Sequence, residues 1–572
     1  MLLWVGTLKN FIKPICIAAC ATGVSAQTIP GSVEPGRTES RFEAPTTPRA
    51  VPTARQGLES TVPPAQAAQI PLSITGFRIV GATALEASAL QAVVAPFQDQ
   101  NGTLLDVFQA AAALTAYYGD KGYLLSRAIV PPQELEPSVA VITLQLIEGY
   151  VDRVAVPGDL GSRAPLLQQH ARNVEASRPL NADRLEREML LANDIPGLTV
   201  QSNLSASPTT PAASTLTLTT QEDRGGWGLR LDNRGSDASG PLQFTISGEA
   251  NNLLGLNEQI SGGLTLAGPA DSSNRPELAY VFLGYDQVLN ASGLRFSFDV
   301  NYSQGDPDSA ALTALDYETE GFNASVALSY PFIRTRSRNL SGVLAFDFKN
   351  SESTNFAGVA SEDRLRILRA ELNFDNADQY NGTNQVRLAF HKGIDGLGST
   401  SSTNPNASRT PGEVDFLKAT LELSRTQNLG QGFSLHGSVF GQWTDDPLLS
   451  SQECGYGGQQ YGRGFDSSVI TGDTCVKGSV EMRYNLPSGE FTQGLNLDYA
   501  QLYAFADAGR IGNITPPAGT PSSDNASSAG LGVRFGLRNM SFDVSAAKPL
   551  NTPSSINIDD DWQGFFSLSA RF

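Results

Sequence analysis

From about residue 225 to the C-terminus, apolar and polar residues alternate along segments of about ten residues. In residues 294–302 every second residue is apolar, and Arg, Ser, Asp and Asn stand between them. Residues 322–330 repeat the pattern with Asn and Ser as the intervening residues, and turns rich in Gly, Asn, Asp and Ser separate such segments. Because side chains of a strand point alternately to its two faces, each segment predicts a strand with one apolar and one polar face.

This two-residue repeat predicts a membrane β-barrel over residues 222–572. A soluble β-sandwich or β-helix is the alternative, but the apolar face extends over more residues than one sandwich needs. About 20–22 residues per strand with its connection predict about sixteen antiparallel strands around an aqueous lumen. The last strand alternates to the end of the chain, with Phe566, Leu568 and Phe572 on one face.

A different pattern precedes the barrel. Residues 72–149 read as strand, two amphipathic helices and two strands, and residues 150–221 repeat the same order. The repeat predicts two duplicated α+β domains of about 70–80 residues each.

The N-terminus predicts a secretory signal peptide over residues 1–26, with Lys9 and Lys13 before a short apolar run and Val24-Ser25-Ala26 at the cleavage site. A lipoprotein box ending at Cys20 is an alternative that would leave too short an apolar run. Residues 27–71 are rich in Pro, Thr and Ala and predict a flexible periplasmic arm. Its helix candidates, such as residues 53–60, are short and bounded by prolines, which argues against a long helix that plugs the barrel.

Composition excludes several function classes. The net charge of −18 argues against binding nucleic acid through its phosphates. No phosphate-binding loop, nucleophile elbow or dinucleotide fingerprint occurs, so neither an enzyme nor a cofactor is expected. The three histidines, His170, His391 and His436, lack metal-ligand spacing, and the acidic run at residues 559–561 reads as a solvated turn.

Two cysteines remain after cleavage of the signal peptide, Cys454 and Cys475, at the ends of a glycine-rich stretch. Without neighbouring histidines they make a poor zinc site. In an exported chain two cysteines are expected to form a disulfide, here across a loop of about 20 residues.

The order of signal, Pro-rich arm, two duplicated units and barrel resembles the outer-membrane transporters of two-partner secretion. These are the haemolysin and filamentous haemagglutinin transporters, in the superfamily that includes the barrel-assembly factor. The duplicated units resemble POTRA domains, on stretches such as FRIVGAT, KGYLLSRAIVPPQ and LIEGYVDRV in the first unit and RPLNADRLEREMLLANDIPGLTVQSNL in the second. Residues 231–240 and 546–550 also resemble family stretches.

The resemblance assigns roles to particular residues. Arg463-Gly464-Phe465 resembles the tip of a long loop, near residues 454–475, that folds back into the barrel in this superfamily, although Gly462 stands where an aliphatic residue is usual. Phe505, Asp507 and Gly509 match the inner-wall motif whose acidic residue pairs with that arginine. A terminal aromatic such as Phe572 resembles the signal that the barrel-assembly machinery recognises during biogenesis.

The resemblance implies an outer-membrane pore, with its POTRA domains in the periplasm, that captures an unfolded exoprotein, either an adhesin or a cytolysin, and passes it to the cell surface. Residues of the first unit that would contact the partner are expected near the end of its second helix: Tyr117, Tyr118, Tyr123, Leu124 and Ser126. Two alternatives stay open. One is a barrel-assembly factor, which would carry more POTRA units; the other is a diffusion porin or surface receptor, which would need none.

Overall fold

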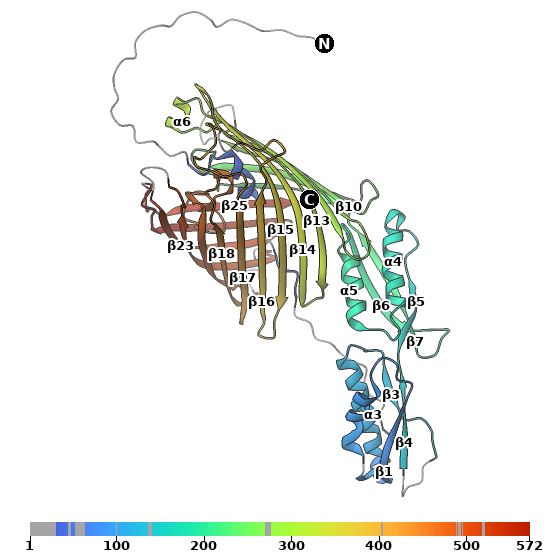
Figure 1. Cartoon of the computed structure of the whole chain (residues 1–572). Helices are drawn as coiled ribbons and strands as arrows, with labels where there is room; N and C mark the ends of the chain where they lie inside the picture. Colours follow the sequence, from blue (N-terminus) through green and yellow to red (C-terminus); the bar gives the residue numbers. More distant parts are fainter. Residues whose placement is uncertain are drawn as a thin grey trace, which may run out of the picture.

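The computed structural model describes residues 30–43, 47–51, 63–98, 100–134, 140–268, 276–401, 404–487, 489, 494, 496–516, 521–556 and 558–572. Two small α/β units extend in a line from a large barrel, and a short blue N-terminal segment lies within the barrel (Figure 1). The expected signal peptide and the helix candidate at 53–60 lie outside the described residues. Among the described residues, no helix is long and apolar enough to cross a membrane.

Sixteen antiparallel strands close into one barrel, which confirms the prediction made from the alternation. The strands are β8 (Gly225–Asp232), β9 (Leu242–Asn251), β10 (Glu258–Gly268), β11 (Leu278–Val288), β12 (Arg295–Gly305), β13 (Glu318–Arg334), β14 (Arg338–Asn355), β15 (Gly358–Ala377), β16 (Gly382–Gly393), β17 (Leu417–Gly430), β18 (Phe433–Thr444), β21 (Thr474–Asn485), β22 (Tyr499–Gly512), β23 (Ser523–Leu537), β24 (Met540–Asn551) and β25 (Gln563–Arg571). A short helix, α6 (Ala310–Ala314), lies in the loop between β12 and β13.

The barrel closes where β25 pairs with β8 over only five residue pairs, from Ser567↔Asp232 to Arg571↔Gly228. The C-terminal Phe572 continues this seam. Its ring stacks on Trp227 at a centroid distance of 4.4 Å, and the two residues exchange backbone hydrogen bonds of 2.8 and 3.0 Å. The terminal aromatic therefore contributes to closure of the barrel.

The first small unit, residues 67–147, has the sheet order β2-β1-β4-β3 with its helices against the sheet. Its elements are η2 (Ala67–Gln69), β1 (Pro71–Val80), α2 (Ala87–Val94), η3 (Ala95–Phe97), β2 (Gln100–Thr103), α3 (Leu104–Asp120), β3 (Arg127–Ile129) and β4 (Ala140–Ile147). Strand β2 was not expected, because its four residues, QNGT, carry no apolar alternation. A capping box between Thr103 and Asp106 starts α3 directly after it.

The second unit has the sheet order β5-β7-β6 and follows the predicted β-α-α-β-β order. Its elements are β5 (Tyr150–Ala155), η4 (Gly161–Arg163), α4 (Ala164–Glu175), α5 (Ala182–Asn193), β6 (Leu198–Ala206) and β7 (Ala213–Glu222). Asn181 caps α5 by accepting hydrogen bonds from the backbone N–H groups of Asp183 and Arg184.

The second unit packs against the turns at one end of the barrel. The Asp194 carboxylate, just after α5, accepts hydrogen bonds of 2.8 Å from Nε and Nη2 of Arg334 at the end of β13. Arg187 donates from Nη2 to the backbone carbonyl oxygen of Pro331 at 3.0 Å. This end of the barrel is therefore the end that faces the two small units.

The expectation of a flexible arm over residues 27–71 is wrong for residues 30–42. These residues form a segment with η1 (Pro35–Arg37) and α1 (Thr38–Phe42) that lies inside the barrel, hereafter the plug segment. Apolar patterning did not reveal it because ion pairs hold it: Glu39 pairs with Lys349 on β14 at 2.9 Å, and Arg37 pairs with Glu453 at 3.0 Å. Two apolar contacts add to these ion pairs: Val33 is buried in a cluster with Ala238, Leu312 and Tyr317, and the Phe42 ring stacks on Tyr280 at 4.7 Å.

Candidate functional site

A long loop between β18 and β21 folds into the barrel. It contains η5 (Ser450–Gln452) and a small hairpin of β19 (Cys454–Tyr456) and β20 (Ile470–Gly472). A disulfide joins Cys454 at the start of this hairpin to Cys475 on the barrel strand β21. Tyr456 and Phe465 of the loop are buried against β22 and β23. We call residues 445–473 the inward loop.

Arg463 at the tip of the inward loop meets Asp507 on β22. Three groups of Arg463 donate to the Asp507 carboxylate: the backbone N–H at 2.9 Å, Nε at 3.0 Å and Nη2 at 2.8 Å. The guanidinium carbon lies 3.6 Å from the ring centroid of Phe505, a cation–π contact. The structure thus brings together Arg463 with Phe505 and Asp507 of the predicted wall motif, in a charge-assisted contact that excludes most water.

The third residue of that wall motif, Gly509, leaves room for the loop. A Cβ atom there would lie 2.3 Å from Cδ2 of Tyr456, so any side chain at Gly509 would displace the Tyr456 ring. The backbone conformation explains why glycine occupies position 462. Its φ of +87° lies in the left-handed region, which glycine adopts without strain and an aliphatic residue does not.

Several residues of this site were missed by sequence reasoning. Glu481 on β21 pairs with Nη1 of Arg463 and also with Arg483 at 2.7 Å and Arg534 at 2.8 Å. Ser479 accepts a hydrogen bond from Nη2 of Arg463 at 2.8 Å. The alternation of residues 479–485 already placed Ser479 and Glu481 on the polar face, but that pattern alone does not reveal which loop residue reaches them.

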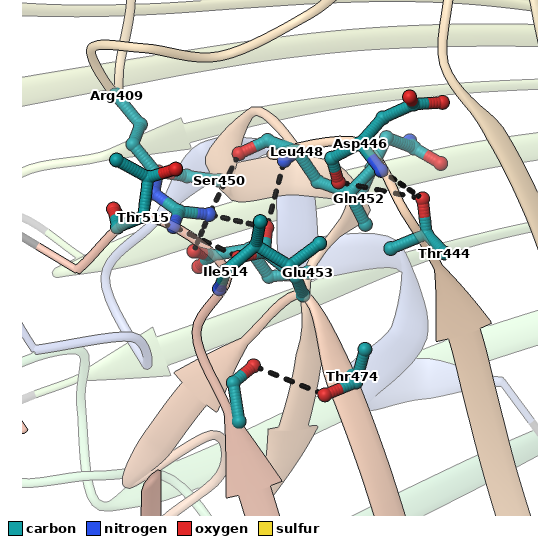
Figure 2. Close-up of polar contacts among 12 residues, drawn as sticks. Arg409, Thr444, Asp446, Leu448, Ser450, Gln452, Glu453, Thr474, Ile514 and Thr515 are labelled. Atoms are coloured by element: carbon teal, nitrogen blue, oxygen red, sulfur yellow. Dashed lines mark hydrogen bonds and ion pairs between the residues drawn. The ribbon is translucent and has the colours of Figure 1, made fainter. Parts of the chain in front are cut away.

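A second polar cluster fixes the base of the inward loop (Figure 2). Arg409, from the loop between β16 and β17, pairs with both Asp473 and Glu453 and donates to the backbone carbonyl oxygen of Thr515 at 3.2 Å. The Asp473 carboxylate is fully buried and also accepts the backbone N–H groups of Leu448 at 2.7 Å and Ile514 at 2.8 Å. The carboxylates of Asp473 and Glu453 therefore connect three loops at the barrel end opposite the small units: residues 394–416, the inward loop and residues 513–522.

Glu453 also holds the plug segment. Arg37 donates from Nη2 to Glu453 at 3.0 Å and to the carbonyl oxygen of Ser450 at 2.5 Å. Burial raises the pKa of Glu453, and the neighbouring Arg37 and Arg409 guanidinium groups oppose that rise. Burial raises the pKa of Glu34 in the same segment to about 7. Glu453 of the inward loop therefore pairs both with Arg37 of the plug segment and with Arg409.

The predicted partner-contact residues of the first unit divide into two groups. Tyr118 and Ser126 are buried: the Tyr118 hydroxyl donates to Glu148 at 2.8 Å, and Ser126 Oγ accepts the backbone N–H of Gly149 at 3.3 Å. Their side chains stabilise the unit and are not available to a partner. Tyr117, Tyr123 and Leu124 are partly exposed, and their role stays a prediction.

The histidines occupy unrelated places. His170 bonds Glu188 at 2.8 Å between α4 and α5, whereas His391 and His436 lie on the barrel strands β16 and β18. Among the described residues, no group of three or more His, Cys, Asp or Glu side chains could hold a metal ion.

Comparison with known proteins relates the chain to a family of secretion proteins. The family model "Haemolysin secretion/activation protein ShlB/FhaC/HecB" matches residues 213–535, and the model of the ShlB-type POTRA domain matches residues 72–149. The heme/hemopexin transporter protein HuxB of Haemophilus influenzae is 23% identical over 476 residues, which cover 82% of this chain and 81% of HuxB. The hemolysin transporter protein ShlB of Serratia marcescens is 24% identical, with 82% and 80% of the two chains covered.

The fold is similar to that of a solved transporter. The structure of CdiB from Escherichia coli matches with a TM-score of 0.72 at 19% sequence identity, and the match covers 92% of this chain and 94% of CdiB. The match extends over the barrel and the small units alike, so the arrangement of both parts recurs in that protein.

Proposed function

The chain belongs to the ShlB/FhaC/HecB family of haemolysin secretion/activation proteins, two-partner secretion transporters with periplasmic POTRA domains and a β-barrel pore in the outer membrane, and from this premise we propose how it works. Its POTRA domains capture one unfolded exoprotein in the periplasm, and the exoprotein then crosses the barrel lumen in extended form. The plug segment and the inward loop close the lumen at rest. The partner is a large secreted protein of the adhesin or cytolysin kind.

One observation carries this proposal: two chain segments enter the lumen, and ion pairs to the inner wall hold both of them, with an apolar cluster around Tyr456 and Phe465 adding to the contacts of the inward loop. The plug segment depends on ion pairs to Lys349 and Glu453, and the inward loop tip depends on Asp507 and Glu481. Ionic contacts can be exchanged for water when a segment leaves, whereas an apolar core resists hydration. The two segments therefore form a removable closure.

The sheets of both POTRA domains support capture by strand addition. Each sheet is open, and its outer strands, β2 and β3 in the first domain and β5 and β6 in the second, pair with one neighbour each. An extended chain can pair with such an edge through backbone hydrogen bonds whatever its sequence. This mode suits a partner that must stay unfolded until it reaches the surface.

Biogenesis is proposed to use the barrel-assembly machinery. Phe566, Leu568 and Phe572 belong to the last strand and its end, and Phe572 lies on the seam where the last strand pairs with the first. Surface-exposed apolar side chains on the outer face of the strands then contact outer-membrane lipid.

Comparing the secreted proteins of a wild-type strain and a strain lacking this gene tests the proposal. Loss of one large exoprotein from the medium supports export of a dedicated partner. Loss of many outer-membrane barrels would instead show an assembly factor, and a change in small-solute uptake alone would show a porin.

A further inference from the structure

Four neighbouring strands leave a hollow on the outer, lipid-facing side of the barrel, near the end that faces the POTRA domains. The groove has a volume of about 400 Å³. Its lining comes from alternate residues of β13 to β16: Leu328, Gly342, Leu344, Ala370, Leu372 and Phe390. Strand pairing aligns them in rows, with Leu328 opposite Leu344, Leu344 opposite Ala370 and Ala370 opposite Phe390.

A bulge in β13 shapes this groove. The register shifts between Pro331, which pairs with Ser341, and Ile333, which pairs with Leu340, so Phe332 is the extra residue. Proline cannot donate to a ladder and is tolerated at such a bulge. The ring of Phe332 lies over Gly342, where a Cβ atom would come within 2.8 Å of its Cε2 atom, yet 55% of Phe332 stays exposed. Phe332 thus lines one side of the groove, and the small residues Gly342 and Ala370 leave space between the larger apolar side chains.

A basic turn lies below the groove. Residues 334–338 read Arg-Thr-Arg-Ser-Arg in a chain of net charge −18. Arg334 forms an ion pair with Asp194 of the second POTRA domain. Arg336 and Arg338 are exposed, and neither guanidinium has a partner among the residues that the structure describes. Arg338 has the same parity on β14 as Gly342 and Leu344, which places it on the lipid-facing side in line with the groove.

We propose that this face binds one phospholipid of the periplasmic leaflet, with its phosphate on Arg336 and Arg338 and one acyl chain in the groove. Guanidinium groups match the geometry of a phosphate and can contact two of its oxygens. Two cationic side chains beside an apolar groove at the depth of the headgroups are the arrangement expected for an anionic lipid. The turn faces the POTRA domains, so the periplasmic leaflet supplies the lipid.

The lipid would lie beside the contact between the second POTRA domain and the barrel. Arg187 of that domain donates to the carbonyl oxygen of Pro331 in the same bulge, and the backbone N–H of Arg336 donates to Glu186. A bound lipid would therefore stabilise the turn at residues 334–338, which contacts the second POTRA domain.

Native mass spectrometry of the detergent-purified full chain, titrated with dioleoylphosphatidylglycerol, tests the proposal. The wild-type chain is expected to retain one phospholipid. R338A should weaken its affinity about fivefold, the usual effect of one arginine near an anionic headgroup. A370W, which fills the groove on the exposed face, should weaken retention while leaving the barrel folded. R538A, at an exposed arginine on another turn of the same barrel end, is the matched control and should not change retention.

Three outcomes would overturn the proposal. If R338A retained the phospholipid as well as the wild type does, Arg338 would not bind the headgroup. If A370W retained it equally well, the groove would not hold the acyl chain. A retained lipopolysaccharide or a second copy of the chain in place of a phospholipid would show that another occupant covers this face.

Discussion

Loss of the Asp507 charge should release the tip of the inward loop. Asp507→Asn keeps the volume of the side chain, so no cavity forms, but it removes the charge that faces Arg463. Asp507 is 2% exposed and accepts three hydrogen bonds from Arg463, which makes it the main partner of a buried guanidinium.

The free-energy cost of releasing the loop tip in D507N follows from the burial of the Arg463–Asp507 pair. Removing one partner of a buried ion pair costs about 3–5 kcal/mol, because the remaining charge stays desolvated. Glu481 and Ser479 still contact Arg463, so we take the lower value. A cost of about 3 kcal/mol raises the population of the released loop about 150-fold.

Trypsin cleavage after Arg463 reads out that population directly. Arg463 is 8% exposed when the loop is seated, so trypsin should reach it only in the released state. When opening and closing are faster than cleavage, the cleavage rate follows the released population, and D507N should be cut about 150-fold faster than the wild type. Because Cys454 and Cys475 flank the cut, the two fragments should stay joined on a non-reducing gel and separate on a reducing gel.

The matched control is D299N, which removes a carboxylate from β12 without touching the inward loop among the described residues. Its cleavage after Arg463 should stay at the wild-type rate. If D507N were cut no faster than D299N, the Asp507 contact would not hold the loop, and the reasoning would fail.

Three further predictions concern the disulfide and the plug segment. C454S/C475S should lower the free energy of unfolding of the barrel by about 3 kcal/mol on the loop-entropy model, measured by urea titration, and an unchanged midpoint would make the disulfide incidental. R37A should raise the frequency of open-channel events in planar lipid bilayers because it frees the plug segment from Glu453, whereas R49A, at an exposed arginine, should not; equal traces for the two variants would contradict the plug assignment. Desolvation raises the pKa of the half-buried Glu34 carboxyl to about 7, so the seated plug binds a proton more tightly than the released one, and seating should weaken as pH rises from about 4.5 to about 7. Open events should therefore be more frequent at pH 8 than at pH 5, and E34Q should abolish this dependence; a wild-type channel with the same activity at both values would refute it.

The barrel and the repeated small units could be predicted from the sequence because their signals are local. A strand with one lipid-facing side repeats its pattern every two residues, and the length of the region with this pattern predicted about sixteen barrel strands, as observed. The β-α-α-β-β order of the second unit follows from helical and strand periodicity in the same way. Strand β2 of the first unit lacks such a pattern and was missed.

The plug segment shows why the rest could not be predicted. Residues 30–42 have the composition of a solvated arm, and their burial depends on partners distant in the sequence, such as Glu453, Lys349 and Tyr280. The same holds for the pairs of Glu481 with Arg463 and of Arg409 with Asp473, because each pair joins segments distant in the sequence or on different loops. The position of Arg463 opposite Asp507 was expected from a family motif rather than from any pattern within the loop.

The central claim is that this chain exports one dedicated exoprotein, and reconstitution in a second host measures this most directly. The host would express the exoprotein that the comparison of secreted proteins identifies. Three strains would be compared: one with the full chain, one with a variant lacking residues 73–150, and one with the exoprotein alone. The account predicts the exoprotein in the medium only with the full chain, while the shortened variant still inserts its barrel in the outer membrane. Appearance of the exoprotein in the medium without the chain, or at the full level with the shortened variant, would contradict it.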